Sequence, residues 1–243
     1  LSPVCQNRDM ASGVRARMNT SLNSDVWVVI PLFNEAPVVG GVIDELHTAF
    51  SNIVCIDDGS TDGSGEVARA HGARVVTHPI NLGQGAALQT GINFARVRPE
   101  TQYVVTFDAD GQHRIEDSLA MLDVARAQDL GVVFGSRFLD DRTQPGVLKK
   151  IVLKTAVLVT NITTHMKLTD AHNGLRVLRV DACNKINMQQ DRMAHASEIV
   201  AQIGKSGVPW QEYPVEVIYT DYSKAKGQSL LNAINIVFEL IVK

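Results

Sequence analysis

Short apolar runs and helix-length segments alternate along residues 26–107, and this alternation limits the fold more than any other feature of the chain. The expected strands are 26–30, 53–56, 73–76 and 103–107, and the expected helices between them are 37–50, 64–71 and 83–97. Strands that are apolar throughout are typical of a parallel sheet covered by helices on both faces. The pattern therefore predicts an α/β domain with a mostly parallel central sheet.

The rest of the chain has a more mixed pattern. Beyond residue 130 we expect strands at 131–134, 174–179 and 213–219 and helices at 146–165 and 193–206. A length of 243 residues fits one domain with short extensions. The expected organisation is a loose polar leader at 1–24, the domain at 25–229, and an apolar helix at 230–243 that docks, lies in a membrane interface or is part of a membrane segment.

Charged residues are unevenly distributed, although the net charge is only −3. Every lysine lies at or after Lys149, so the first half of the chain is acidic and the second half is basic. The weak net charge argues against nucleic acid as a partner, while the basic half suits an anionic acceptor or lipid headgroups. Ordinary solvated surface charge explains the division equally well. The three cysteines show neither metal-ligand nor disulfide spacing, which indicates a reducing cytoplasm.

Three of the expected strands end in polar residues, and a parallel sheet brings such strand ends to one edge. The first strand leads to Asn34 and Glu35, the second to Asp57 and Asp58, and the fourth to the segment Asp108-Ala109-Asp110-Gly111-Gln112. Carboxylates held this close repel one another unless a cation or hydrogen bonds offset the repulsion. The oxygen ligands of Asp-x-Asp-x-Gln suit Mg²⁺ or Mn²⁺, which takes its other ligands from water and substrate phosphates.

Two other interpretations of the turn sequences are weaker. A calcium-binding helix–loop–helix needs Glu at its twelfth position, but counting from Asp108 and Asp57 gives Leu119 and Ala68. Residues 81–87 open a helix with two glycines, where backbone N–H groups could hold a phosphate, although a closely packed helix start is the favoured interpretation. The spacing matches neither a dinucleotide fingerprint nor an ATP-binding loop.

Taken together, these segments resemble glycosyltransferase family 2, which has the Rossmann-like GT-A fold. Within that family they are similar to the branch of dolichyl-phosphate mannose synthase and bacterial polyprenyl-phosphate glycosyltransferases. The matching segments keep the family's order along residues 26–229, and they are 30–35, 56–63, 81–87, 107–112, 135–137, 170–176 and, more weakly, 227–229.

The resemblance implies a role for each matching residue. In the nucleotide pocket, Pro31, Glu35 and Asp57 would line the base site with Asp58 at its edge. The full set implied to bind the nucleotide sugar is Pro31, Asn34, Glu35, Asp57, Asp58, Asn81, Gly83 and Asp108. The residues implied to hold Mg²⁺ or Mn²⁺ with the donor diphosphate are Asp108, Asp110 and Gln112. The implied catalytic residues are Asp110, Arg137, Asp170, Arg176 and Glu198, with Arg137 at a phosphate, and the implied acceptor residues are Lys149, Lys150, Asn173, Lys224 and Lys226.

Several neighbouring residues have structural interpretations. Asp62 is expected to cap the helix that follows it. His113 is expected on the surface of its loop, and His172 is expected to be a hydrogen-bonded wall of the site. Arg176 and Glu198 could equally form a structural ion pair.

The acceptor is predicted from a departure from the family pattern. Members that glycosylate hydroxyls carry a Glu-Asp pair late in the domain, whose Asp is the general base, but this chain has Ser197-Glu198. A hydroxyl acceptor needs a positioned base, whereas a lipid phosphate is already anionic near neutral pH. The helix at 146–165 mixes apolar and basic positions as interfacial helices do, although an ordinary core helix fits it about as well.

The sequence thus predicts an inverting, metal-dependent hexosyltransferase that moves a sugar from a UDP-, GDP- or dTDP-linked donor to polyprenyl phosphate in cell-envelope glycan synthesis. Transfer to a hydroxyl of a growing polysaccharide, with Glu198 or Asp170 as base, and a non-catalytic GT-A binding module stay open as alternatives. The expected location is the cytoplasm, peripheral on the inner face of the membrane, directly or through a small anchoring partner. Self-association as a homo-oligomer also stays open.

Overall fold

The computed structural model describes residues 22–140, 154–155, 157–158, 160–162, 164, 166–189 and 194–218. Within these residues the strands are β1 (Val26–Leu32), β2 (Asn52–Asp57), β3 (Arg74–Thr77), β4 (Tyr103–Thr106), β5 (Val132–Ser136), β6 (Arg176–Arg179) and β7 (Trp210–Pro214). The helices are α2 (Ala36–Leu46), α3 (Ser64–Ala70), α4 (Gln84–Arg96), α5 (Ile115–Ala127), α7 (Val180–Cys183) and α8 (Ala194–Ser206). Residues described between 154 and 164 are also helical.

All seven described strands form one sheet in the order β3-β2-β1-β4-β6-β5-β7. β1 is parallel to β2 and β4, β2 is parallel to β3, and β5 is parallel to β7. β6 is antiparallel to both of its neighbours, β4 and β5. The prediction of a mostly parallel sheet is therefore confirmed, with one reversed strand in its second half.

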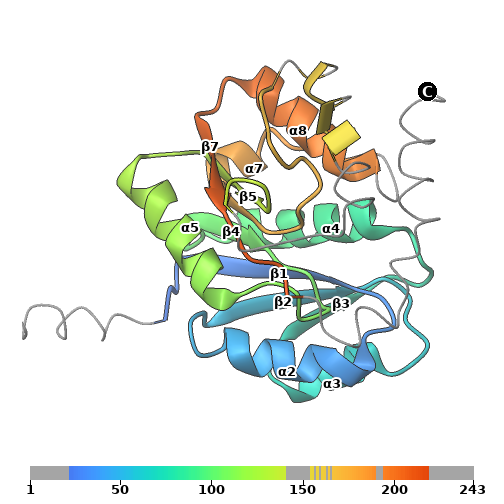
Figure 1. The fold of residues 1–243 in the computed structure, drawn as a ribbon. Coiled ribbons are helices and arrows are strands. Elements are labelled where there is room, and N and C mark those ends of the chain that lie inside the picture. Colours follow the sequence, from blue (N-terminus) through green and yellow to red (C-terminus); the bar gives the residue numbers. More distant parts are fainter. Residues whose placement is uncertain are drawn as a thin grey trace, which may run out of the picture.

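Helices cover both faces of this sheet, as Figure 1 shows with α2 and α3 on one side and α4 and α8 on the other. The apolar side chains of β1 alternate between the two layers because successive side chains of a strand point to opposite faces. Val28 and Ile30 pack with apolar residues of α2 and α5, whereas Trp27 and Val29 pack with those of α4 and α8. Burial on both faces explains why this strand is apolar throughout.

Two elements differ from the prediction. α5 was not expected, although Met121, Leu122 and Ala125 form its buried face. The last strand was expected at 213–219 but occupies Trp210–Pro214, and every one of its residues is only partly buried because β7 is the edge of the sheet. A half-buried polar strand lacks the apolar run that identifies an interior strand.

Some expectations concern residues outside those described. They are the leader at 1–24, of which only residues 22–24 are described, the apolar helix at 230–243, and the part of the helix at 146–165 that precedes residue 154. Among the described helices, none combines the length and the apolar character needed to cross a membrane.

Candidate active site

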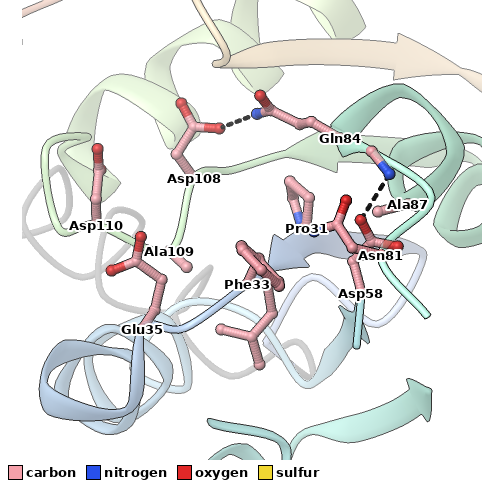
Figure 2. Close-up of a pocket in the computed structure, with 12 residues that line it drawn as sticks. Pro31, Phe33, Glu35, Asp58, Asn81, Gln84, Ala87, Asp108, Ala109 and Asp110 are labelled. Carbon is pink, nitrogen blue, oxygen red and sulfur yellow. Dashed lines mark hydrogen bonds between the residues drawn. The ribbon is translucent and has the colours of Figure 1, made fainter. Parts of the chain in front are cut away.

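A cavity of about 470 Å³ lies at the edge of the sheet where β1, β2 and β4 end. Its walls are formed by Pro31, Leu32, Phe33, Glu35, Asp58, Asn81, Gly83, Gln84, Ala87, Asp108, Ala109 and Asp110. The predicted gathering of strand-end carboxylates is therefore present. Figure 2 shows Asp110 and Glu35 at one end of the cavity and Asp58 and Asn81 at the other.

The segment after β1 is fixed to the loop after β2. Asn34 adopts a left-handed backbone conformation with φ of 54°. Its Oδ1 accepts the N–H of Thr61 at 3.0 Å, and its own N–H donates to Ser60 Oγ at 3.0 Å. The Asn34 side chain thus joins two loops and is not among the residues that line the cavity. Asn34 supports the wall, and its predicted contact with the nucleotide stays a prediction.

The two aspartates after β2 have different surroundings. Asp57 is buried and accepts the N–H of Ser60 at 3.0 Å, and it does not line the described cavity. Asp58 lines the cavity, although it was expected only at the edge of the base pocket. Asp62 was expected to cap α3, but the N-cap residue is Gly63, and Asp62, one residue earlier, accepts the N–H of Ser64 at 3.0 Å.

Asp108 is held between two loops. Its Oδ2 lies 2.9 Å from His113 Nε2, and its Oδ1 lies 3.4 Å from Gln84 Nε2. His113 was expected on the loop surface, but only 4% of its side chain is exposed, so that expectation is wrong. The apolar side of its ring packs edge-on against Phe107 at 5.4 Å between centroids, which explains why the imidazole turns inward.

The two aspartates predicted to hold the metal differ in protonation. Burial opposes ionisation of Asp108, but the hydrogen bond and charge of His113, with the charges of Arg176 and His195, hold its pKa below the usual range. Burial and the negative charge of Asp108 raise the pKa of Asp110 to about 6. A cation between the two carboxylates would relieve this repulsion, so the residues present fit a divalent metal.

The protein alone does not enclose such an ion. Among the described residues, no three His, Cys, Asp or Glu side chains converge closely enough to hold a metal. Gln112 is buried and does not line the cavity, but its N–H donates to Asp110 Oδ1 at 3.1 Å and so orients that carboxylate. Two carboxylates with open remaining positions suit Mg²⁺ or Mn²⁺, which usually keeps water and substrate phosphates as ligands.

Arg137 and Asp170 form a buried bidentate ion pair. Arg137 Nε and Nη2 donate to the two oxygens of Asp170 at 2.6 and 2.8 Å, and the Asp170 side chain is fully buried. Burial opposes ionisation of Asp170, but the charge and hydrogen bonds of Arg137 hold its pKa below the usual range. Glu212 fixes the same loop by accepting the N–H groups of Thr169 and Asp170. Glu212 lies outside every motif of the sequence, so its role was not predicted.

Arg176 is a buried cation beneath the acidic residues. Burial lowers its pKa to about 10, although the charges of Asp108 and Asp170 act in the opposite direction. Its Nε and Nη1 have no hydrogen-bond partner among the residues that the structure describes. These two acids, rather than Glu198, supply the charge around it. Glu198 instead accepts from the Gln189 N–H at 3.0 Å.

His172 and Asn173 complete the buried polar group beside Arg176. Within the described part of the chain, both ring nitrogens of His172 and Nδ2 of Asn173 lack hydrogen-bond partners, so the expected hydrogen bond of His172 is not found there. Burial lowers the pKa of His172 to about 4, which leaves it neutral near pH 7. The remaining acceptor candidates, Lys149, Lys150, Lys224 and Lys226, lie outside the described residues.

Gly174 gives room to the Asp108 carboxylate. A Cβ at residue 174 would lie 2.7 Å from Asp108 Cγ and closer still to Oδ2. We expect Gly174→Ala to displace Asp108 and to lower the glycosyl transfer predicted from the sequence by about 10²-fold, the effect of misplacing a catalytic group by about 1 Å. Initial rates with UDP-, GDP- and dTDP-sugars in the presence of Mn²⁺ measure it. Gly41→Ala is the matched control because a Cβ there meets nothing within 4 Å, and an equal loss in that variant would contradict the explanation.

Comparison with known proteins agrees with this fold and cavity. Residues 27–186 match Glycosyl transferase family 2. An uncharacterized protein of Methanocaldococcus jannaschii is 31% identical over 239 residues, which cover 95% of this chain and 98% of the relative. The UDP-N-acetylglucosamine–dolichyl-phosphate N-acetylglucosaminyltransferase of Methanococcus voltae is 25% identical over 239 residues, with 89% and 95% covered.

A solved structure shows the same architecture. Glucosyl-3-phosphoglycerate synthase from Mycobacterium tuberculosis, in complex with Mn²⁺, uridine diphosphate and phosphoglyceric acid, superposes with a TM-score of 0.64 at 16% identity. The match covers 90% of this chain and 78% of that one. The fold is the GT-A fold, and the family match over residues 27–186 shows that the protein is a glycosyltransferase. The chain belongs to glycosyltransferase family 2, as the sequence predicted.

Proposed function

We propose that this glycosyltransferase moves a sugar, with inversion, from a nucleotide diphosphate donor to polyprenyl phosphate in the synthesis of cell-envelope glycans, with Mg²⁺ or Mn²⁺ bound. The donor would occupy the cavity at the sheet edge. Among the carboxylates that line it, Glu35, Asp108 and Asp110 support a cation and a nucleotide sugar rather than an anion alone.

The residues proposed to hold the metal are Asp108 and Asp110, with Gln112 as a further candidate. A bound divalent cation supplies charge neutralisation, which makes the nucleoside diphosphate a better leaving group. Asp108 keeps its negative charge near neutral pH because its pKa is lowered, whereas Asp110, whose pKa is about 6, exchanges a proton close to that range. Asn81 lies at the opposite end (Figure 2), and Asn81 and Gly83, which both line the cavity, would contact the nucleoside.

The proposed acceptor rests on one observation: both oxygens of Asp170 already accept hydrogen bonds from the protein. A hydroxyl acceptor needs a base that takes its proton, and Asp170 was the candidate nearest the site. Both of its oxygens accept hydrogen bonds from Arg137, one also accepts the His172 N–H at 3.2 Å, and its pKa is lowered. Asp170 is therefore a poor base, which favours an acceptor that is already anionic.

Two further observations support a lipid phosphate. The Methanococcus voltae relative acts, by its name, on dolichyl phosphate. In the helical residues after 153, Leu158 and Ile162 are 59% and 65% exposed and lie one turn apart. Exposed apolar side chains near the exposed Lys154 suit a membrane surface, so we propose a peripheral position at the inner face of the membrane.

The acceptor is tested by comparing polyprenyl phosphate with the same polyprenol lacking phosphate. Each lipid is incubated with UDP-, GDP- and dTDP-sugars and Mn²⁺, and products are identified by mass. We expect transfer to the phosphate and none to the alcohol. Transfer to an oligosaccharide hydroxyl alone, lost in Asp170→Asn or Glu198→Gln, would establish the alternative acceptor and contradict the proposal.

A further inference from the structure

We propose that two buried histidines, His78 and His113, each hold one end of this cavity in place. His78 would set the nucleoside wall through Asp58, and His113 would set the metal end through Asp108. The inference rests on the proposed binding of a nucleotide and a divalent cation, but not on the acceptor. Neither histidine would touch the substrate, so both are positioning residues.

The Asp58 carboxylate is fully engaged by the chain itself. Its Oδ1 accepts the Leu82 N–H at 2.9 Å and lies 2.7 Å from His78 Nδ1, and its Oδ2 accepts the Gly83 N–H at 2.8 Å. Only 4% of the Asp58 side chain and 10% of the His78 side chain are exposed. A carboxylate with three donors has little capacity left for a ligand, so its task is to hold the loop at 80–83.

This loop has few other attachments. Ile80 and Leu82 are 64% and 42% exposed, so burial of their apolar side chains contributes little to its position. The loop nevertheless packs closely on the turn after β2, because a Cβ at Gly59 would lie 2.8 Å from Asn81 N. Hydrogen bonds to Asp58 therefore fix the wall that presents Asn81 and Gly83 to the cavity.

His78 extends this network to α4. Its Nε2 lies 3.0 Å from Thr90 Oγ1, on the second turn of the helix. The imidazole thus joins the loop after β2 to the body of α4, and Gln84 begins that helix within the cavity wall. Loss of the imidazole would leave Asp58 with two of its three donors and would remove the link between Asp58 and α4.

His113 has the corresponding place at the metal end. It binds only Oδ2 of Asp108, while Oδ1 faces Gln84, so the carboxylate is oriented without being fully occupied. The Asp108 side chain remains 28% exposed, in contrast to Asp58. The His113 backbone is itself fixed by an antiparallel bridge to Val217. Asp108 is thus held with one oxygen available for a ligand.

The two pairs lie at different strand ends and are connected only indirectly, through Gln84, which follows Gly83 in the chain and contacts Asp108. Asp58 follows β2 and Asp108 follows β4, and β1 separates these strands in the sheet. They share no hydrogen-bonding residue, so their effects should be additive, as they are for sites without common partners.

The test measures each ligand alone in the full-length protein. Binding of nucleoside diphosphate is followed by calorimetry in EDTA, and binding of Mn²⁺ is followed by electron paramagnetic resonance without nucleotide. We expect His78→Ala to raise the nucleotide Kd about tenfold and to leave the Mn²⁺ Kd unchanged. His113→Ala should raise the Mn²⁺ Kd about 10–100-fold, as loss of a partner behind a metal ligand does, and leave the nucleotide Kd unchanged.

Conservative variants separate positioning from general loosening. His78→Asn retains a donor near Nδ1, and His113→Gln retains one near Nε2, so each should recover most of the lost affinity. Thr90→Val removes the second partner of His78 and should weaken the binding of nucleotide but not that of Mn²⁺. It replaces His78→Ala in the test if that variant does not fold. Equal weakening of both ligands by either variant would overturn the inference, whereas a wild-type protein that binds neither ligand would overturn the proposed donor and metal site.

Discussion

Asp110→Asn is expected to lower kcat/KM for glycosyl transfer by about 10³-fold, a loss typical of removing a group that stabilises charge in the transition state. The amide has nearly the size of the carboxylate but lacks the negative charge that we propose to bind the cation with Asp108. Steady-state rates and Mn²⁺ titration measure the change. A variant that keeps wild-type Mn²⁺ affinity would contradict the proposed metal site.

The same substitution, which should lower activity, should raise the stability of the folded protein. The pKa of Asp110 rises from 3.8 to about 6 in the folded protein, so folding binds a proton to this group. For a carboxylate with a raised pKa, the folded state loses stability as pH rises from the unfolded value towards the folded value. In EDTA, Asp110→Asn should therefore melt at a higher temperature than wild type at pH 7.5, and the difference should shrink as pH falls below 6. A lower melting temperature of Asp110→Asn than of wild type at pH 7.5 would show that repulsion between Asp108 and Asp110 does not destabilise the folded protein.

Asp170→Asn is expected to lower the free energy of unfolding by about 3–5 kcal/mol, because it leaves the guanidinium of Arg137 without its buried counter-charge. The two side chains are 0% and 11% exposed, so water cannot replace the lost partner. Urea unfolding measures the effect. The double variant Arg137→Met/Asp170→Asn should recover part of the loss, because it removes the uncompensated charge.

An exposed pair provides the matched control for that experiment. Arg126 Nη2 also donates to both oxygens of an aspartate, Asp25, at 2.7 and 2.9 Å. These side chains are 35% and 36% exposed, and exposed ion pairs contribute little. Asp25→Asn should therefore cost less than about 1 kcal/mol. Equal losses in the two variants would show that burial does not determine the strength of the Arg137–Asp170 pair.

Local sequence patterns predicted the elements that carry the cavity. The apolar run before Asp108 identified β4, and the parallel arrangement of β1, β2 and β4 then brought Glu35, Asp58 and Asp108 to one edge. The family and its fold were also predicted, because ordered motifs along most of the chain are far more specific than any one of them. These features depend on residues close together in sequence.

Contacts between distant segments were not predicted. Arg137 and Asp170 are 33 residues apart, and nothing in either segment indicates that the two residues expected at a substrate bind each other instead. His78 lies outside every motif and 20 residues from Asp58. The direction of β6 was also unpredictable, because a strand of only four residues shows the same pattern in either orientation, and pairing with β4 and β5 decides its direction.

The reversed direction of β6 has a consequence for how such an enzyme can change over time. β6 is antiparallel to β4, so it begins at the edge of the sheet where β4 ends, and residues 170–175 lead into the sheet there, with Gly174 against the Asp108 carboxylate. The segment that we propose to face the acceptor thus comes from a different stretch of chain than the loops that we propose to surround the nucleoside. Substitutions on this incoming segment can alter acceptor preference while the donor side keeps its geometry.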